Sequence, residues 1–126
     1  MSRAFLVLGA VNAFLCVVLG ALGAHGLKSI LAPDILTTFQ VGVQYHFYHA
    51  IGLILVGLTL DRFPQARALK FSGILMLIGI VLFSGTLYIV SVTGWKGLSM
   101  TAPLGGMSYM SAWLLFAWAI WKNKSV

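Results

Sequence analysis

The sequence predicts an all-α integral membrane protein, a four-helix bundle that forms a single membrane domain over residues 1–126. Hydrophobic residues make up 60% of the chain and charged residues 8%. Ordinary soluble domains are about 25% charged, so this composition places the chain in a membrane. Four apolar runs, separated by short polar loops, are each near the ~20 residues that a helix needs to cross a bilayer. Because lipid offers the backbone no hydrogen-bond partners, each run is expected to be helical.

The expected spans lie near residues 4–24, 40–60, 71–92 and 104–121. The first run is longer than the roughly 7–15 apolar residues of a signal peptide, and three more runs follow it, so we expect it to be retained. The loop before the third span is a basic turn with Pro64. Before the fourth span, Thr101 can cap a helix whose first turn contains Pro103. The single cysteine, Cys16, lies inside the first run and has no intramolecular partner for a disulfide.

The loop between the first two spans is longer than a connection requires and predicts a short interfacial helix. Gly26 can end the first span in a left-handed conformation. Apolar residues then recur at helical spacing opposite Lys28 and Asp34; they are Leu27, Ile30, Leu31, Ile35, Leu36 and Phe39. Pro33 interrupts this segment, and a new helix is expected to start near Asp34 and continue into the second span.

The basic residues predict the orientation of the chain. Two of them, Lys28 and Lys96, lie on one side of the expected bundle. The other six lie at the termini and in the middle loop: Arg3, Arg62, Arg67, Lys70, Lys122 and Lys124. By the positive-inside rule, both termini are expected in the cytoplasm. The formal charge of +6 is therefore interpreted as a topology signal, and no nucleic-acid partner is expected.

Small and weakly polar side chains predict a packing seam between helices. In the first span they fall within about 100° of one another on a helical projection, and in the third span they share one face. The candidate seam consists of Gly9, Asn12, Cys16, Gly20, Ser84 and Tyr88. Asn12 offers both a donor and an acceptor for a bond to another helix. We interpret the seam as close helix packing, with a ligand groove as the alternative, and we expect Trp113 and Trp118 to meet lipid or a partner chain.

A cluster of ionisable rings is the candidate functional site: His25, Tyr45, His46 and His49. On the second span, His46 and His49 share a face about 9 and 13 Å below Gln40. Four interpretations stay open. The rings can bond across the bundle, pass a proton or small solute, bind a metal together with Asp34, or hold a haem.

Motifs for catalysis are not found. The spans contain no acidic residue, and the chain has no phosphate-binding glycine loop, nucleophile elbow or CxxC pair. We therefore expect no enzyme activity and no catalytic residue, and we assign no cofactor and no metal.

Four motifs in fixed order resemble one known family. They are GALGAHGL at Gly20–Leu27, YHFYHA at Tyr45–Ala50, LFSGTLY at Leu82–Tyr88 and TAPLGG at Thr101–Gly106. Together they resemble DUF423, a family of small bacterial inner-membrane proteins related to eukaryotic transmembrane protein 256. The resemblance covers essentially the whole chain and implies a four-span, multi-pass protein of the inner (plasma) membrane whose molecular activity is not established. In the family pattern, glutamine commonly stands at the position of His46, whereas His25 and His49 match the motifs.

These observations predict a small inner-membrane protein with an interaction or accessory role. Its expected surroundings are the lipid bilayer and either a second copy of the chain or a membrane-protein partner. The alternative is a carrier or channel for a proton or small solute along the face of His46 and His49. A haem- or metal-binding membrane protein is the less favoured alternative.

Overall fold

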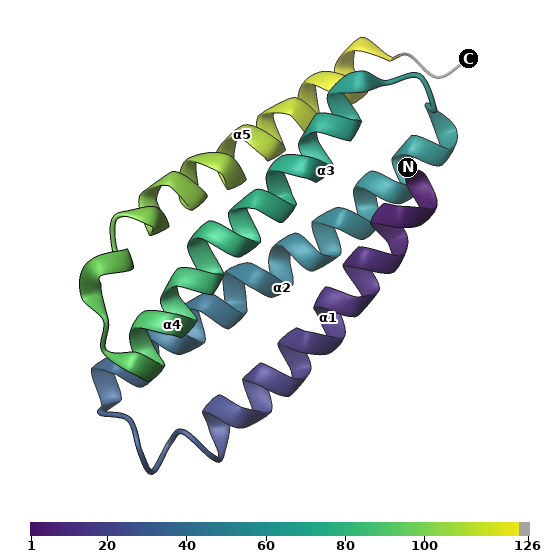
Figure 1. The fold of residues 1–126 in the computed structure, drawn as a ribbon. Coiled ribbons are helices and arrows are strands. Elements are labelled where there is room, and N and C mark those ends of the chain that lie inside the picture. The colour runs from purple at the N-terminus through teal and green to yellow at the C-terminus, as the bar shows by residue number, and fades with distance from the viewer. Residues whose placement is uncertain (124–126) are drawn as a thin grey trace.

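Four long helices run side by side and alternate in direction in the computed structural model, which describes residues 1–123 (Figure 1). The third long helix is continuous but contains a π turn, labelled η1, and a short 3₁₀ turn, η2, precedes the last helix. The elements are α1 (Ser2–Ala24), α2 (Pro33–Arg62), α3 (Arg67–Gly79), η1 (Ile80–Ser84), α4 (Gly85–Thr93), η2 (Lys96–Leu98) and α5 (Thr101–Lys122). The predicted all-α bundle is confirmed, and each long helix begins before its expected span, α2 at Pro33 instead of residue 40 and the others two to four residues early.

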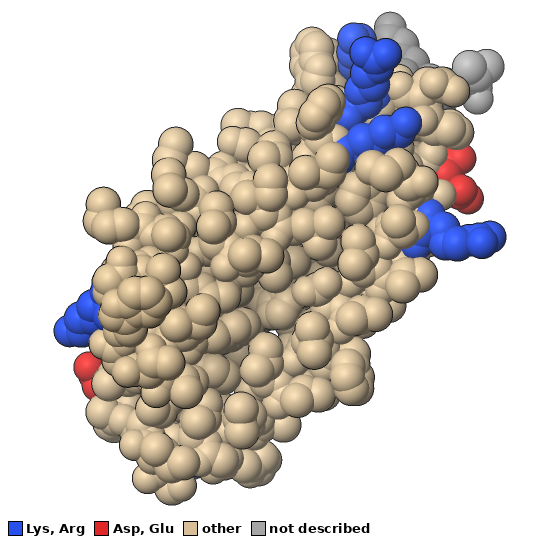
Figure 2. Space-filling view, in the orientation of Figure 1, with Lys and Arg blue, Asp and Glu red and all other residues tan. Residues whose placement is uncertain are grey.

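Charged groups lie at the two ends of the bundle. The N-terminus and the end of α5 lie at the same end (Figure 1). Figure 2 shows Lys, Arg and acidic groups gathered at that end and at the opposite end, with an uncharged band between them. Many large apolar side chains within this band are exposed, including Phe14, Val17, Val81 and Leu114. An uncharged, apolar belt of this kind is suited to contact with lipid.

Three of the helices are long and apolar enough to cross a membrane, judged by length and composition over residues 1–123: Ser2–Ala24, Pro33–Arg62 and Arg67–Thr93. Helix α5 has 22 residues but interleaves its apolar side chains with glycine, serine and tryptophan. It packs along α3, where Ser72 Oγ donates to the Ala112 carbonyl (2.7 Å) and Ser108 Oγ donates to the Leu75 carbonyl (2.7 Å). A fourth crossing by α5 stays a prediction.

The predicted short interfacial helix between the first two spans does not form. Residues 25–32 instead fold back in turns, with bonds from Leu27 N to Leu22 O (2.8 Å) and from Leu31 N to Leu27 O (2.9 Å). Ala32 is extended (φ −60°, ψ 151°) and precedes Pro33, the first residue of α2. Proline disfavours a helical conformation in the residue before it, which leaves too few residues after α1 for a separate helix. The predicted helix start near Asp34 is confirmed.

Left-handed backbone appears at a different glycine from the one expected. Gly26 is not left-handed; within residues 1–123, the one glycine with positive φ is Gly94 (φ 72°), directly after α4. Its amide donates to the Val90 carbonyl, which closes the helix as a left-handed cap.

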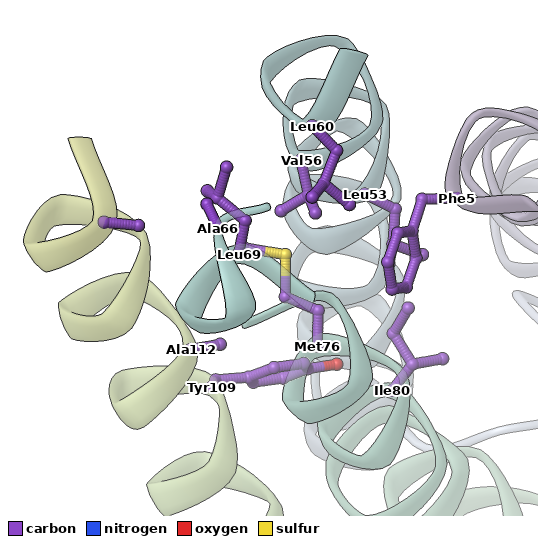
Figure 3. Close-up of a cluster of buried hydrophobic side chains, with 11 residues drawn as sticks. Phe5, Leu53, Val56, Leu60, Ala66, Leu69, Met76, Ile80, Tyr109 and Ala112 are labelled. Carbon is purple, nitrogen blue, oxygen red and sulfur yellow. The ribbon is translucent and has the colours of Figure 1, made fainter. Parts of the chain in front are cut away.

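The best-packed core joins the four helices in the half of the bundle nearer the termini. Its side chains come from α1, α2, α3 and α5 and point toward one another (Figure 3). Leu53, Val56, Leu69 and Met76 are fully buried there. Phe5 reaches this core from α1 and is also buried. Toward the other end, aromatic and polar side chains replace aliphatic ones, and the candidate site lies in that region.

Candidate functional site

A concave groove opens between α2 and α5. Its volume is about 820 Å³. We call it the aromatic groove; it is lined by Tyr45, Phe47, Tyr48, His49, Ile51, Phe83, Gly106, Tyr109, Met110 and Trp113. Seven of these ten residues carry an aromatic or imidazole ring. Rings therefore make up most of the lining of the groove.

The π turn η1 supplies one wall of the aromatic groove. Here the Gly85 amide donates to the Ile80 carbonyl, five residues earlier, which inserts one extra residue into the helical turn. Phe83 within this turn lines the groove, and the next residue, Ser84, bonds the Tyr109 hydroxyl (3.0 Å). Single π turns inside α-helices occur frequently at functional sites.

His49 is held in one orientation at the base of the aromatic groove. The Trp113 indole N–H donates to His49 Nε2 (3.0 Å), and indole nitrogen can only donate. Nδ1 therefore carries the ring proton and donates to the Tyr45 carbonyl (2.6 Å). The imidazole also stacks on the Tyr109 ring, with centroids 3.5 Å apart and planes 8° from parallel. These contacts fix a neutral imidazole with both nitrogens bonded.

His46 faces a different set of neighbours and takes no part in the groove. Its Nε2 lies 2.8 Å from Asn12 Oδ1 on α1, and its Nδ1 lies 2.8 Å from the Tyr88 hydroxyl on α4. Asn12 Nδ2 donates to the Leu8 carbonyl (2.8 Å), which directs the amide oxygen toward His46. An amide oxygen only accepts, so Nε2 carries the proton and Nδ1 accepts from Tyr88. His46 thus joins three helices through one directed chain of hydrogen bonds.

The residues of the candidate seam lie at interfaces between helices. A Cβ atom on Gly9 would lie 2.6 Å from Ile54 Cγ1 and 2.8 Å from the Ala50 carbonyl oxygen, so α1 and α2 touch through their backbones. Cys16 is buried, and a Cβ on Gly20 would reach Val43 at 3.7 Å. On the third long helix, Tyr88 bonds His46 while Ser84 bonds Tyr109. The small residues of α1 therefore line its contact with α2.

The structure does not bring the four predicted ring residues together. Tyr45 and His49 line the aromatic groove, His46 lies between α1, α2 and α4, and His25 is exposed just after α1. In residues 1–123, no three or more histidine, cysteine, aspartate or glutamate side chains are grouped so that they can hold a metal ion. The metal interpretation, which needed His25, His46 and His49 at one place, is not supported by this arrangement.

The two tryptophans expected on the outer surface have different environments. Trp118 is exposed, as expected for contact with lipid or a partner. Trp113 is only 37% exposed, because its indole bonds His49 and its ring packs edge to face against Phe116, with 74° between the planes. Sequence reasoning also missed Phe83 and Tyr109. These two residues belong to helices that the sequence does not show to be neighbours of the second span. The tryptophan and tyrosine residues of the last span were the one sequence feature that could have indicated an aromatic site there.

The comparisons with known proteins agree with this helical membrane architecture. The family described as "Protein of unknown function (DUF423)" matches residues 19–106. The chain belongs to this family. The matched region includes the four motifs noted above and contains most of the aromatic groove, from Tyr45 to Gly106. The resemblance drawn from those motifs is thereby confirmed.

Curated relatives are named only as membrane proteins. The chain is 45% identical to the UPF0382 membrane protein YwdK of Bacillus subtilis over 90% of this chain and 92% of the relative. It is 35% identical to a UPF0382 membrane protein of Haemophilus influenzae over the full length of both. It is 29% identical to the UPF0382 inner membrane protein YgdD of Escherichia coli over 90% of this chain and 86% of the relative. No solved structure matches the chain.

Proposed function

We propose that this protein is a non-catalytic binding protein of the bacterial inner membrane that holds a small apolar membrane component in the aromatic groove. The observation that carries the proposal is the groove itself. Its volume of about 820 Å³ lies within the ~300–1,000 Å³ typical of small-molecule sites, which are mainly apolar with a few fixed polar groups. His49 lies near the middle of α2, so the groove is level with the bilayer interior. This proposal narrows the interaction or accessory role expected from the sequence.

The hydrogen bonds of the two histidines favour binding over proton transport. A carrier using one face of α2 needs His46 and His49 to exchange a proton along a shared path. His46 instead bonds to α1 and α4, and His49 bonds to α5. The chain of bonds through His46 ends at the Leu8 carbonyl, a backbone acceptor. Both imidazoles thus support rigid placement of the surrounding helices, which a preformed binding groove requires.

The proposal predicts that a bound molecule co-purifies with the protein and is lost when the groove is filled. A Cβ on Gly106 has its nearest neighbour, Phe83 Cδ2, at 3.9 Å, so Gly106→Leu adds a side chain to the groove without a backbone clash. Ala117→Leu adds similar bulk at an exposed position of α5 outside the groove. The three proteins are purified from native membranes in mild detergent, and their organic extracts are compared by mass spectrometry.

We expect one molecule to be present in near-stoichiometric amount in the wild-type and Ala117→Leu proteins. Its amount should fall by about tenfold or more in Gly106→Leu, which requires the loss of at least about 1.4 kcal/mol of binding free energy. Equal extracts from all three folded proteins would contradict the proposal.

We further propose that both termini face the cytoplasm. Arg3, Arg62, Arg67, Lys70 and Lys122 lie in or beside the helix ends at the terminal end of the bundle, whereas Lys28 and Lys96 lie near the opposite end. This distribution supports the orientation by the positive-inside rule.

Two reporters are fused in turn after Lys124, which lies outside the described residues: one is active only in the cytoplasm and the other only in the periplasm. Only the cytoplasmic reporter should be active. The same reporters inserted after Lys96 should show the periplasmic response. Reversal of both results would show that the orientation is wrong.

A further inference from the structure

We infer that the aromatic groove takes a lipid with a planar conjugated ring, of the prenylated quinone class. This inference rests on the proposed function and names the chemical class of the bound molecule. It follows from three properties of the lining: its ring content, one unbonded hydroxyl group, and the fixed positions of its rings.

The ring content separates this groove from a site for ordinary acyl chains. Lipid tails are as apolar as leucine, so an aliphatic lining would satisfy an acyl chain equally well. Aromatic faces and edges add about 0.5–1.5 kcal/mol per pair only when the partner also has a π face. Seven ring residues from α2, η1 and α5 line this groove, and only Ile51, Gly106 and Met110 do not carry rings. The lining therefore favours a flat conjugated partner.

The Tyr45 hydroxyl is the polar group available to such a ring. Within residues 1–123, the Tyr45 hydroxyl forms no hydrogen bond; the side-chain bond at this residue goes from His49 to its backbone carbonyl. Tyr45 lines the groove and is 41% exposed. By contrast, the Tyr48 hydroxyl accepts from Gln44 and the Tyr109 hydroxyl bonds Ser84. A quinone carbonyl oxygen accepts a hydrogen bond and carries no charge, so it matches the Tyr45 donor in an otherwise apolar cavity.

The rings that surround this hydroxyl are already held in place. Tyr45 lies 5.1 Å from Phe83 and 6.5 Å from Tyr109, between ring centroids, and its plane is 18° from that of Tyr109. Phe83 is set by the π turn, and one face of Tyr109 is covered by His49. A lining that is ordered before binding loses little side-chain freedom when a rigid ring enters, which favours a flat ring over a flexible chain.

Quenching of Trp113 fluorescence tests this inference. Because a quinone accepts an electron from an excited indole on contact, decylubiquinone is a direct probe of the groove. The full chain carries Trp95→Phe, Trp118→Phe and Trp121→Phe, so that only Trp113 emits, and it is placed in phosphatidylcholine nanodiscs. The matched control keeps Trp118 as the only tryptophan; Trp118 is exposed on the same helix outside the groove.

We expect saturable quenching of Trp113 and linear, non-saturable quenching of Trp118. Adding Tyr45→Phe, which removes only an exposed hydroxyl, should weaken the apparent affinity at Trp113 about three- to tenfold, as loss of one neutral hydrogen bond does. Linear quenching of Trp113 that matches Trp118 would overturn the inference. The organic extracts of the purified proteins separate this failure from a failure of the proposed function. If they contain an acyl lipid that Gly106→Leu displaces, the proposed function stands and only the assignment of a ring-bearing lipid fails.

Discussion

Replacing Gly105 with alanine should destabilise the protein by about 3 kcal/mol, near the upper end of the usual range for overpacking. A Cβ at this position would lie 2.7 Å from the Leu82 carbonyl carbon and 2.8 Å from Phe83 Cα. Both neighbours are backbone atoms of the π turn, so no side chain can move aside. The added methyl group must push α5 away from η1, which would also separate Tyr109 from Ser84.

The neighbouring glycine provides the matched control for this prediction. Gly106→Ala places its methyl group in ordinary van der Waals contact, 3.9 Å from Phe83 Cδ2, with no clash. Because alanine is favoured over glycine in a helix, this change should be neutral or stabilising by about 0.5–1 kcal/mol. The unfolding free energies of both variants can be compared in one detergent by circular dichroism during titration with a denaturing detergent. Equal stability of the two variants would contradict the close contact between α5 and the π turn.

Replacing His46 with leucine should also destabilise the bundle, by about 1–3 kcal/mol, because it leaves two half-buried polar groups unpaired. Both the Asn12 amide oxygen and the Tyr88 hydroxyl lose their partner in this variant. Their bonds connect α1 and α4 to α2, and bonds between helices in lipid are worth about 0.6–2 kcal/mol each.

Glutamine at the same position should restore most of that stability. Its amide nitrogen can donate to Asn12 and its oxygen can accept from Tyr88, which reproduces both roles of the imidazole. The measurement is the unfolding free energy of His46→Leu and His46→Gln beside His25→Gln, a control at an exposed histidine. If His46→Gln is as unstable as His46→Leu, the hydrogen bonds from residue 46 to Asn12 and Tyr88 do not stabilise the bundle.

The sequence predicts the helices well because the requirement for internal hydrogen bonds in lipid is independent of sequence detail. It predicts the contacts of single side chains less well. His46 and His49 share a face on a helical projection, but three residues separate them by about 60° around the axis, at 3.6 residues per turn. In this bundle, that rotation is enough to direct one ring toward α1 and α4 and the other toward α5.

Two further features depend on information that a periodic pattern does not contain. The π turn at Ile80–Ser84 contains no proline, lies between Gly79 and Gly85, and has Gly105 packed closely against its backbone. The aromatic groove combines rings from α2, η1 and α5, so it depends on which helices are neighbours. The expected interfacial helix failed for a local reason, since Pro33 both ends the turns after α1 and begins α2.

The central claim is that the aromatic groove binds a small molecule of the membrane. The most direct test is a crystal structure of the full chain grown from a lipid mesophase after purification from native membranes. We predict well-ordered, non-protein density in the groove, with a flat ring against Tyr45, Phe83 and Trp113. A groove occupied by a helix from a second copy, or density no better ordered than the lipid around α1, would contradict the claim.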